Sequence, residues 1–203
     1  MRTAHSLPPR RIVYAPEHLA LFHDFLECQR QELIKFNVSQ IASADPRFID
    51  PQGVYLLVCE VEGQLRAGAR IHLKRERSTL PIEIALKGWS EELFVRLGEL
   101  KEKRIAEVCG VWVHRSLSGK QFGKTLVAEA TAFANELGME TLVALVPQHP
   151  VSYFKQAGFE YDGRISALPY PDGRFVSRVV WAGAPAEPHY MNRLPEQERR
   201  ERA

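Results

Sequence analysis

The segment that most constrains the fold of this 203-residue chain runs from Glu107 to Gly123 and reads as strand, short loop and helix start. Its first part, EVCGVWV, is dense in β-branched residues and predicts a strand packed on both faces. Small and basic residues follow, and from Phe122 the apolar positions recur at helical spacing. A helix that begins after such a loop presents unpaired N–H groups and partial positive charge, which Lys120 and Lys124 reinforce. The segment therefore predicts an anion site.

This loop resembles the coenzyme A-binding motif of the GNAT superfamily of N-acyltransferases, which is Arg or Gln, two residues, Gly, one residue, then Gly or Ala. Val113 stands at the strand valine of that pattern, and Gly123 fits its last position. Ser118 replaces the Arg or Gln, and Gln121 replaces the first Gly. A residue other than glycine fits at Gln121 only if its φ is negative or its side chain leaves room for the pyrophosphate. The resemblance implies that acetyl-CoA or another acyl-CoA binds Val111, Trp112, Val113, Ser118, Gly119, Lys120, Gln121, Phe122, Gly123, Lys124 and Phe154.

The order of the other elements also resembles this family. Upstream, Val54 to Leu73 reads as two antiparallel strands joined at Glu62-Gly63, a pair that favours a tight hairpin. Downstream, Met139 to Pro147 reads as an apolar strand, and a short helix then ends at Ala157-Gly158-Phe159. The resemblance covers most of Arg11 to Gly183 and implies an α/β fold. We expect a mixed central sheet of about six or seven strands with helices on both faces, in which the strands from Ile105 and Thr141 are parallel.

Local patterns add two helices and two loops. Glu17 to Phe36 suits a long amphipathic helix, and Trp89 to Leu100 suits another, with Ser90 as its N-cap. Asn37 to Gly53 and Leu80 to Trp89 are expected to supply the loops that form the acceptor pocket.

Composition bounds the class of protein. Residues 1–183 fit one GNAT-like domain, and 184–203 read as a charged tail, with a helix packed on a partner subunit of a homodimer as the alternative. A net charge of +2 does not indicate nucleic acid, and no apolar run approaches the roughly 20 residues that span a membrane. The three cysteines lack metal-type spacing, so we expect no metal and a cytoplasmic protein with reduced thiols.

Acylation of an amine requires a base, and Glu107 is the first candidate. Strand alternation puts it on one face with Cys109, Val111 and Val113. Burial on an apolar strand should raise the pKa of its carboxyl, which suits a base working near neutrality. The resemblance supports this role, because family members often have Glu here. The alternative is a structural ion pair with Arg70 on the neighbouring strand.

His114 is the rival base, because imidazole titrates near pH 7. The acid departs from the family pattern, in which a Tyr five residues before the closing Phe protonates the coenzyme thiolate. Phe154 occupies that position, and Tyr153 lies beside it. Adjacent helical residues point about 100° apart, so Tyr153 does not simply substitute, and packing is its alternative role. The catalytic candidates are Glu107, His114 and Tyr153.

A second resemblance concerns the donor. GQLRAGARIHL and IAEVCGVWVH are similar to the hairpin and acidic strand of acyl-homoserine-lactone synthases and long-chain N-acyl amino acid synthases, which commonly use acyl carrier protein. Lys74, Arg75 and Arg77 would then form a basic patch for that acidic partner, or simply a solvated strand end. Three functions stay open. They are an N-acyltransferase (most simply an acetyltransferase) acting on a small-molecule amine or amino-acid-like acceptor, a carrier-protein-dependent synthase, and a catalytically silent ligand-binding module.

Overall fold

A mixed sheet of seven strands forms the centre of the described part of the chain, in the order β1-β2-β3-β4-β5-β7-β6. The computed structural model describes residues 7–38, 41, 44–117, 121–148 and 150–183. The predicted tail, 184–203, lies outside these residues. Strands β4 and β5 are parallel, and the other neighbouring strands pair antiparallel. The predicted α/β class and the parallel pair are therefore confirmed.

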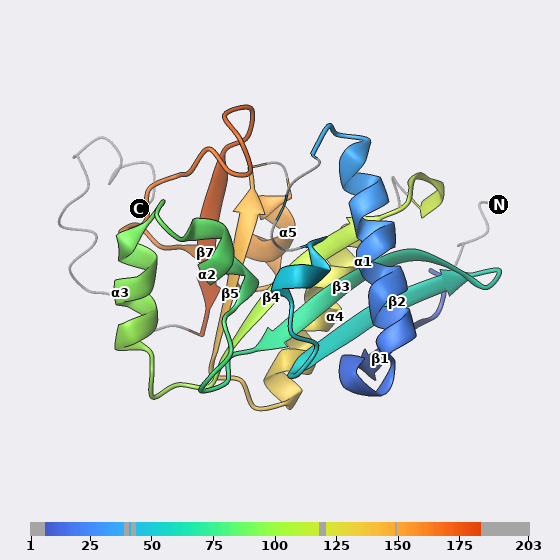
Figure 1. Cartoon of the computed structure of the whole chain (residues 1–203), viewed down its shortest axis with the longest axis horizontal. Helices are drawn as coiled ribbons and strands as arrows, with labels where there is room; N and C mark the ends of the chain where they lie inside the picture. Colours follow the sequence, from blue (N-terminus) through green and yellow to red (C-terminus); the bar gives the residue numbers. More distant parts are fainter. Residues whose placement is uncertain (1–6, 39–40, 42–43, 118–120, 149, 184–203) are drawn as a thin grey trace.

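Helices cover both faces of this sheet. The strands are β1 (Arg10–Tyr14), β2 (Val54–Val61), β3 (Gln64–Leu73), β4 (Ile105–Val113), β5 (Thr141–Pro147), β6 (Glu160–Tyr161) and β7 (Ser177–Ala182). The α-helices are α1 (Leu19–Ile34), α2 (Pro81–Leu86), α3 (Glu91–Glu99), α4 (Phe122–Glu136) and α5 (Val151–Gln156). Short 3-10 turns occupy Ala15–Glu17, Pro46–Phe48 and Arg115–Leu117. Helices α1 and α2 lie on one face, and α4 and α5 lie behind the sheet (Figure 1).

The hairpin between β2 and β3 turns where the sequence predicted. Glu62 has a φ of 54° and Gly63 a φ of 71°, so both central residues adopt the left-handed conformation that two-residue hairpin turns need. Glycine takes this conformation without a steric penalty, whereas the Cβ of Glu62 makes it sterically unfavourable.

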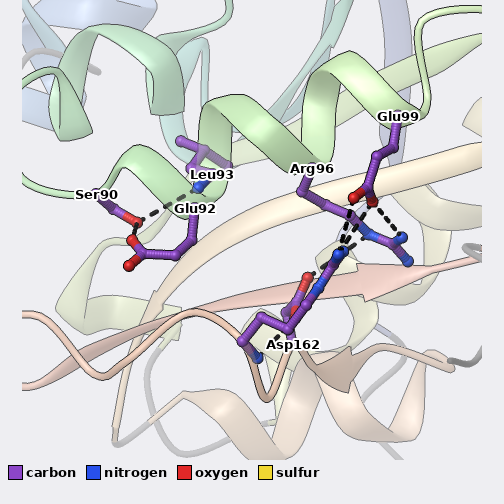
Figure 2. Close-up of polar contacts among 7 residues, drawn as sticks. Ser90, Glu92, Leu93, Arg96, Glu99 and Asp162 are labelled. Carbon is purple, nitrogen blue, oxygen red and sulfur yellow. Dashed lines mark hydrogen bonds and ion pairs between the residues drawn. The ribbon is translucent and has the colours of Figure 1, made fainter. Parts of the chain in front are cut away.

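Helix α3 begins as predicted, and side-chain contacts fix it to the segment after β6. The Ser90 hydroxyl accepts a hydrogen bond from the Leu93 N–H at 3.4 Å, which confirms the N-cap. Further along, the buried Arg96 lies 3.6 Å from a carboxylate oxygen of Asp162, and both side chains are less than a tenth exposed. Figure 2 shows how Arg96, Glu99 and Asp162 converge.

Helix α2 was not predicted, because Leu80 to Trp89 reads as a loop. Only six residues form it, which is too few for helical periodicity to stand out in the sequence. Its first turn is held by the Glu83 carboxylate, which accepts from the Leu80 N–H at 2.7 Å and pairs with Lys74 at 2.7 Å. Pro81 at the first helical position has no N–H to satisfy, which also favours a helix start here.

A β-bulge in β4 overturns one expectation about faces. Arg70 pairs with Cys109 and Gly68 pairs with Trp112, so β4 carries one extra residue, and Gly110 has a φ of 58°. The extra residue reverses the alternation beyond it. Glu107 and Cys109 therefore face α1 and α2, whereas Val111 and Val113 pack with the core under α4. The prediction that Glu107 shares a face with Val111 and Val113 was wrong.

The parallel strands β4 and β5 stay together only at their starts. Their register runs from Ile105↔Thr141 to Glu107↔Val143 and stops there. Beyond Glu107 the bulge carries β4 away from β5, while β5 continues its pairing with β7 to Pro147. The sheet therefore divides at the carboxyl ends of β4 and β5, and Glu107 is the last paired residue before the division.

Candidate active site

A cavity of about 660 Å³ fills the division between β4 and β5. Its floor is β4 from Val108 to Val113, and its opposite wall is Leu145 to Pro147 of β5. At one end lie the start of α4 and Tyr153 of α5. The far end is apolar except for Gln29, and is lined by Leu33, Phe36, Val38, Ile41, Pro171 and Phe175.

Most described coenzyme candidates line this cavity. Val111, Trp112, Val113, Gln121, Phe122, Gly123 and Phe154 all contribute to its wall. Lys124 lies in the first turn of α4, half-buried, and has no ion-pair partner in the part of the chain that the structure describes. Ser118, Gly119 and Lys120 lie outside the described residues. The helix start, its free N–H groups and Lys124 form a surface that suits a phosphate group.

The sequence analysis allowed a residue other than glycine at Gln121 if its φ was negative, and Gln121 does not meet this condition. Its φ is 54°, so a residue with a side chain sits in the left-handed conformation immediately before α4. The second condition therefore applies: the exposed Gln121 side chain has to leave the phosphate path open. The conformation is the one that glycine would supply at no steric cost.

Gly123 allows α4 and α5 to approach closely. A Cβ at this position would lie 3.1 Å from Cε2 of Tyr153 and 4.0 Å from a methyl carbon of Val113. The absent side chain thus lets the start of α4, the Tyr153 ring and the β4 strand meet at one point beside the cavity.

Phe154 takes the place of the family tyrosine and belongs to the core. Its ring lies edge-to-face on Phe159, with centroids 5.3 Å apart, and it is buried. Gly158, with a φ of 89°, closes α5 and lets the Phe159 N–H bond to the Phe154 carbonyl at 3.0 Å. Tyr153 is half-buried, lines the cavity and is the hydroxyl that α5 offers there.

Glu107 is a buried carboxyl near the cavity, but it is not among the residues that line the cavity. It is 2% exposed, and its Oε2 accepts a hydrogen bond from the Ile82 N–H of α2 at 2.8 Å. A smaller pocket of about 70 Å³ touches it and shares Cys109, Gly110 and Pro147 with the large cavity. Burial raises the pKa of the Glu107 carboxyl to about 8, against the opposing effects of the Ile82 N–H and the Arg70 charge. The group can thus exchange a proton near neutral pH.

The ion pair of Glu107 with Arg70 does not form. Across the strands Glu107 faces His72, and Arg70 faces Cys109. No nitrogen of Arg70 has a hydrogen-bond partner within the described residues. Arg70 therefore acts on Glu107 through its charge and not through contact.

His114 lies elsewhere. It lines a separate open hollow of about 580 Å³ between α1 and the β2–β3 hairpin, with Glu32, Lys35 and Arg66. Its Nδ1 lies 2.9 Å from the Ser116 hydroxyl, and partial burial together with nearby cations lowers its pKa. The wall of the cavity at the β4–β5 division does not include it.

The sequence analysis missed the importance of three buried polar residues. It did not identify Gln29 or His72, and it considered Arg70 only as an ion-pair partner of Glu107. A signal for two of them exists in GARIHL, where Arg70 and His72 alternate with apolar residues on a strand that the structure buries on both faces. Gln29 carries a similar signal, because it lies within the apolar stripe of α1.

The basic patch proposed for a carrier protein is reduced. Lys74 pairs with Glu83 at 2.7 Å and donates to the Ser78 carbonyl at 2.8 Å, so its charge is used within the domain. Arg75 and Arg77 are exposed and have no ion-pair partner among the described residues. The described residues contain no group of acidic, histidine or cysteine side chains suited to a metal, and no described helix is long and apolar enough to cross a membrane.

Comparison with known proteins gives one family and a set of similar folds. The family model described as "Acetyltransferase (GNAT) family" matches residues 18–159. Among solved structures, FeeM, an N-acyl amino acid synthase from uncultured soil microbes, superposes with a TM-score of 0.63 at 15% identity, over 85% of this chain and 93% of that one. An acyl-CoA N-acyltransferase from Pseudomonas aeruginosa gives 0.58 at 12% identity, over 86% and 98%.

A third similar structure is BjaI, a CoA-dependent acyl-homoserine lactone synthase solved with SAM and isopentyl-CoA. It gives a TM-score of 0.55 at 12% identity, over 84% of this chain and 80% of that one. These likenesses are of fold. No curated protein sequence matches the chain.

Proposed function

The chain belongs to the acetyltransferase (GNAT) family and is an acyltransferase, and from this premise we propose that it moves an acyl group from acyl-CoA to a small-molecule amine with Glu107 as general base. The observation that carries the proposal is the position of Glu107, a buried carboxyl at the last paired residue before β4 and β5 divide. A proton acceptor at this place lines the small pocket that adjoins the cavity at Cys109, Gly110 and Pro147.

The residues present fit the coenzyme. The start of α4 with Lys124 suits the pyrophosphate, and the backbone of Val111 to Val113 suits the amide groups of the pantetheine arm. The thioester supplies an activated acyl carbon. The protein would hold it along the β4 floor, with the acceptor entering past α2 and Pro171.

The proton balance can be followed at Glu107. The carboxylate takes one proton from the ammonium form of the acceptor, which frees the nitrogen lone pair. The nitrogen then bonds to the acyl carbon as the carbon–sulfur bond breaks. The second nitrogen proton ends on the sulfur, so the products are an amide and a free thiol. Tyr153 is the candidate relay for that second proton, although a thiolate also leaves without help.

A second candidate is a synthase that takes a longer acyl chain from acyl carrier protein. The apolar far end of the cavity favours it, because an acetyl group needs no such lining. Phe36 is 69% exposed and lies at that end, where a long chain would cover it. Arg75 and Arg77 are the exposed charges left for a carrier.

The test is to measure thiol release and amide formation with acetyl-, octanoyl- and lauroyl-CoA and with lauroyl acyl carrier protein, against a panel of amines and amino acids. Turnover with any acyl-CoA supports the first function. Turnover with the carrier protein alone supports the second. Calorimetric binding of acyl-CoA without turnover against the whole panel would overturn both and leave a binding module.

A further inference from the structure

Arg70 is a fully buried cation that no described group neutralises by contact. It is 0% exposed, on the face of β3 that α1 covers. Its Nε, Nη1 and Nη2 have no hydrogen-bond partner of good geometry in the described structure, and the group that interacts with it most closely is the neutral Cys109 thiol. Its guanidinium carbon lies 6.0 Å from the centre of the Phe25 ring. Burying an unpaired charge is strongly unfavourable, so such a residue has to be compensated by nearby charge or retained for its function.

The bulge in β4 is built around this guanidinium. A Cβ at Gly110 would lie 2.6 Å from Nε and 2.9 Å from Nη2 of Arg70, and 3.0 Å from Oε1 of Gln29. Glycine is therefore needed at position 110 twice, for its φ of 58° and for the space that Arg70 fills. Gly110 lies in the part of β4 that is no longer paired with β5, so the guanidinium lies directly against the strand segment that forms the cavity floor.

The groups packed around Glu107 come from several elements. His72 faces it from β3 and Arg70 lies diagonally across on the same strand. Cys109 lies near it on β4, the Ile82 N–H and Glu83 approach from α2, and Tyr170 and Ser177 share its small pocket. Burial and the Arg70 charge hold the pKa of His72 well below its usual range, so His72 is neutral. Burial likewise raises the pKa of the Cys109 thiol. Of these side chains Arg70 alone carries positive charge.

We propose that Arg70 is a positioning residue whose buried charge increases the fraction of Glu107 in the carboxylate form, which accepts the proton of the acceptor amine. The proposal rests on the proposed function for its consequence, but the charge coupling itself does not. Arg70 lines neither cavity, so it acts through Glu107 and not by touching the substrate. Register places it diagonally across from Glu107, near enough to act and too far to pair.

The experiment titrates Glu107 directly. Protein labelled with ¹³C at the glutamate carboxyls is followed by NMR across pH, and the Glu107 signal is assigned by its loss in Glu107→Gln. Wild type is compared with the neutral variants Arg70→Met and Arg70→Gln and with Arg70→Lys. The neutral variants should titrate roughly one to two pH units higher, and Arg70→Lys should stay close to wild type.

Acyl transfer is then measured across pH in the same variants. The rate of the neutral variants at pH 7 should fall about tenfold to a hundredfold and recover at high pH, with the KM for acyl-CoA unchanged. A folded neutral variant with an unmoved Glu107 titration would overturn the proposal. So would a wild-type Glu107 that stays protonated up to pH 10. A moved titration in a protein inactive with every donor would uphold the coupling and overturn the proposed function instead.

Discussion

Gly123 and Gln121 shape the end of the cavity at the start of α4. Gly123 was singled out in the sequence as part of a phosphate loop, and its neighbourhood adds a second constraint, the Tyr153 ring 3.1 Å from where a Cβ would lie. We expect Gly123→Ala to shift that ring and change acyl-CoA affinity only a few-fold. Gly123→Asp adds negative charge beside the phosphates and should weaken binding at least about tenfold more. Calorimetry with acyl-CoA checks this, and equal affinities for the two variants would remove the phosphates from this loop.

Gln121 and Glu62 form a matched pair, because both have a φ of 54° without being glycine. Replacing either with glycine should stabilise the protein by about 0.5–1 kcal/mol, since relief of the left-handed strain exceeds the entropy that glycine adds to the unfolded chain. Urea unfolding measures this.

Acyl-CoA affinity separates the two variants. Only Gln121→Gly should change it, because Glu62 lies in the β2–β3 turn, away from the cavity. Equal effects on affinity from both would contradict the assignment of the α4 start as the coenzyme site.

The sequence predicted which residue would be the buried carboxyl, but it did not predict which face of the sheet that residue occupies. Glu107 was expected to be buried and raised in pKa, and the structure places it so. The face it shares was mispredicted, because strand alternation is counted residue by residue and the bulge at Gly110 breaks the count. EVCGVWV contains a glycine, which hints at a bulge without proving one.

At the level of elements, a buried ion pair between Arg96 and Asp162 is expected to stabilise the packing of α3. Arg96→Met removes a buried partner of Asp162 and should cost about 2–3 kcal/mol, somewhat less than for an isolated buried pair because Arg164 stays 3.5 Å from Asp162. The control is Lys101→Met, whose exposed contact with Glu102 at 4.0 Å should contribute less than about 0.5 kcal/mol. Equal destabilisation of the two variants in urea would show that Arg96 stabilises α3 through its apolar stem alone.

Elements with a strong hydrophobic period or a clear capping residue could be predicted from the sequence, whereas the short helix α2 could not. Helix α1, the α3 N-cap and the β2–β3 turn follow from apolar spacing, Ser90 and Glu62-Gly63. Helix α2 has six residues, and besides its local cap at Leu80 and Glu83 it is held by the tertiary contact between the Ile82 N–H and Glu107. That contact joins elements 25 residues apart, which local patterns do not reveal.

For the whole molecule, the division of the sheet between β4 and β5 is the feature that creates the candidate site. The helix layers bury the two faces separately, and the cavity lies where β4 and β5 part, with the α4 start at one end and α1 at the other. The order of elements predicted the parallel pair. The size and apolar lining of the cavity could not be predicted, because Phe36, Pro171 and Phe175 come from segments far apart in the sequence.

The most direct test of the account is the pH dependence of acyl transfer in wild type, Glu107→Gln and His114→Gln with one accepted amine. A base must be deprotonated, so the wild-type rate should rise as pH passes through the Glu107 pKa of about 8. Glutamine still accepts from the Ile82 N–H, so Glu107→Gln should bind acyl-CoA almost normally. It should lose roughly a hundredfold to ten-thousandfold in rate near neutrality, with partial recovery at high pH where more amine is free. His114→Gln should behave like wild type. Near-normal turnover in Glu107→Gln together with a collapse in His114→Gln would contradict the account.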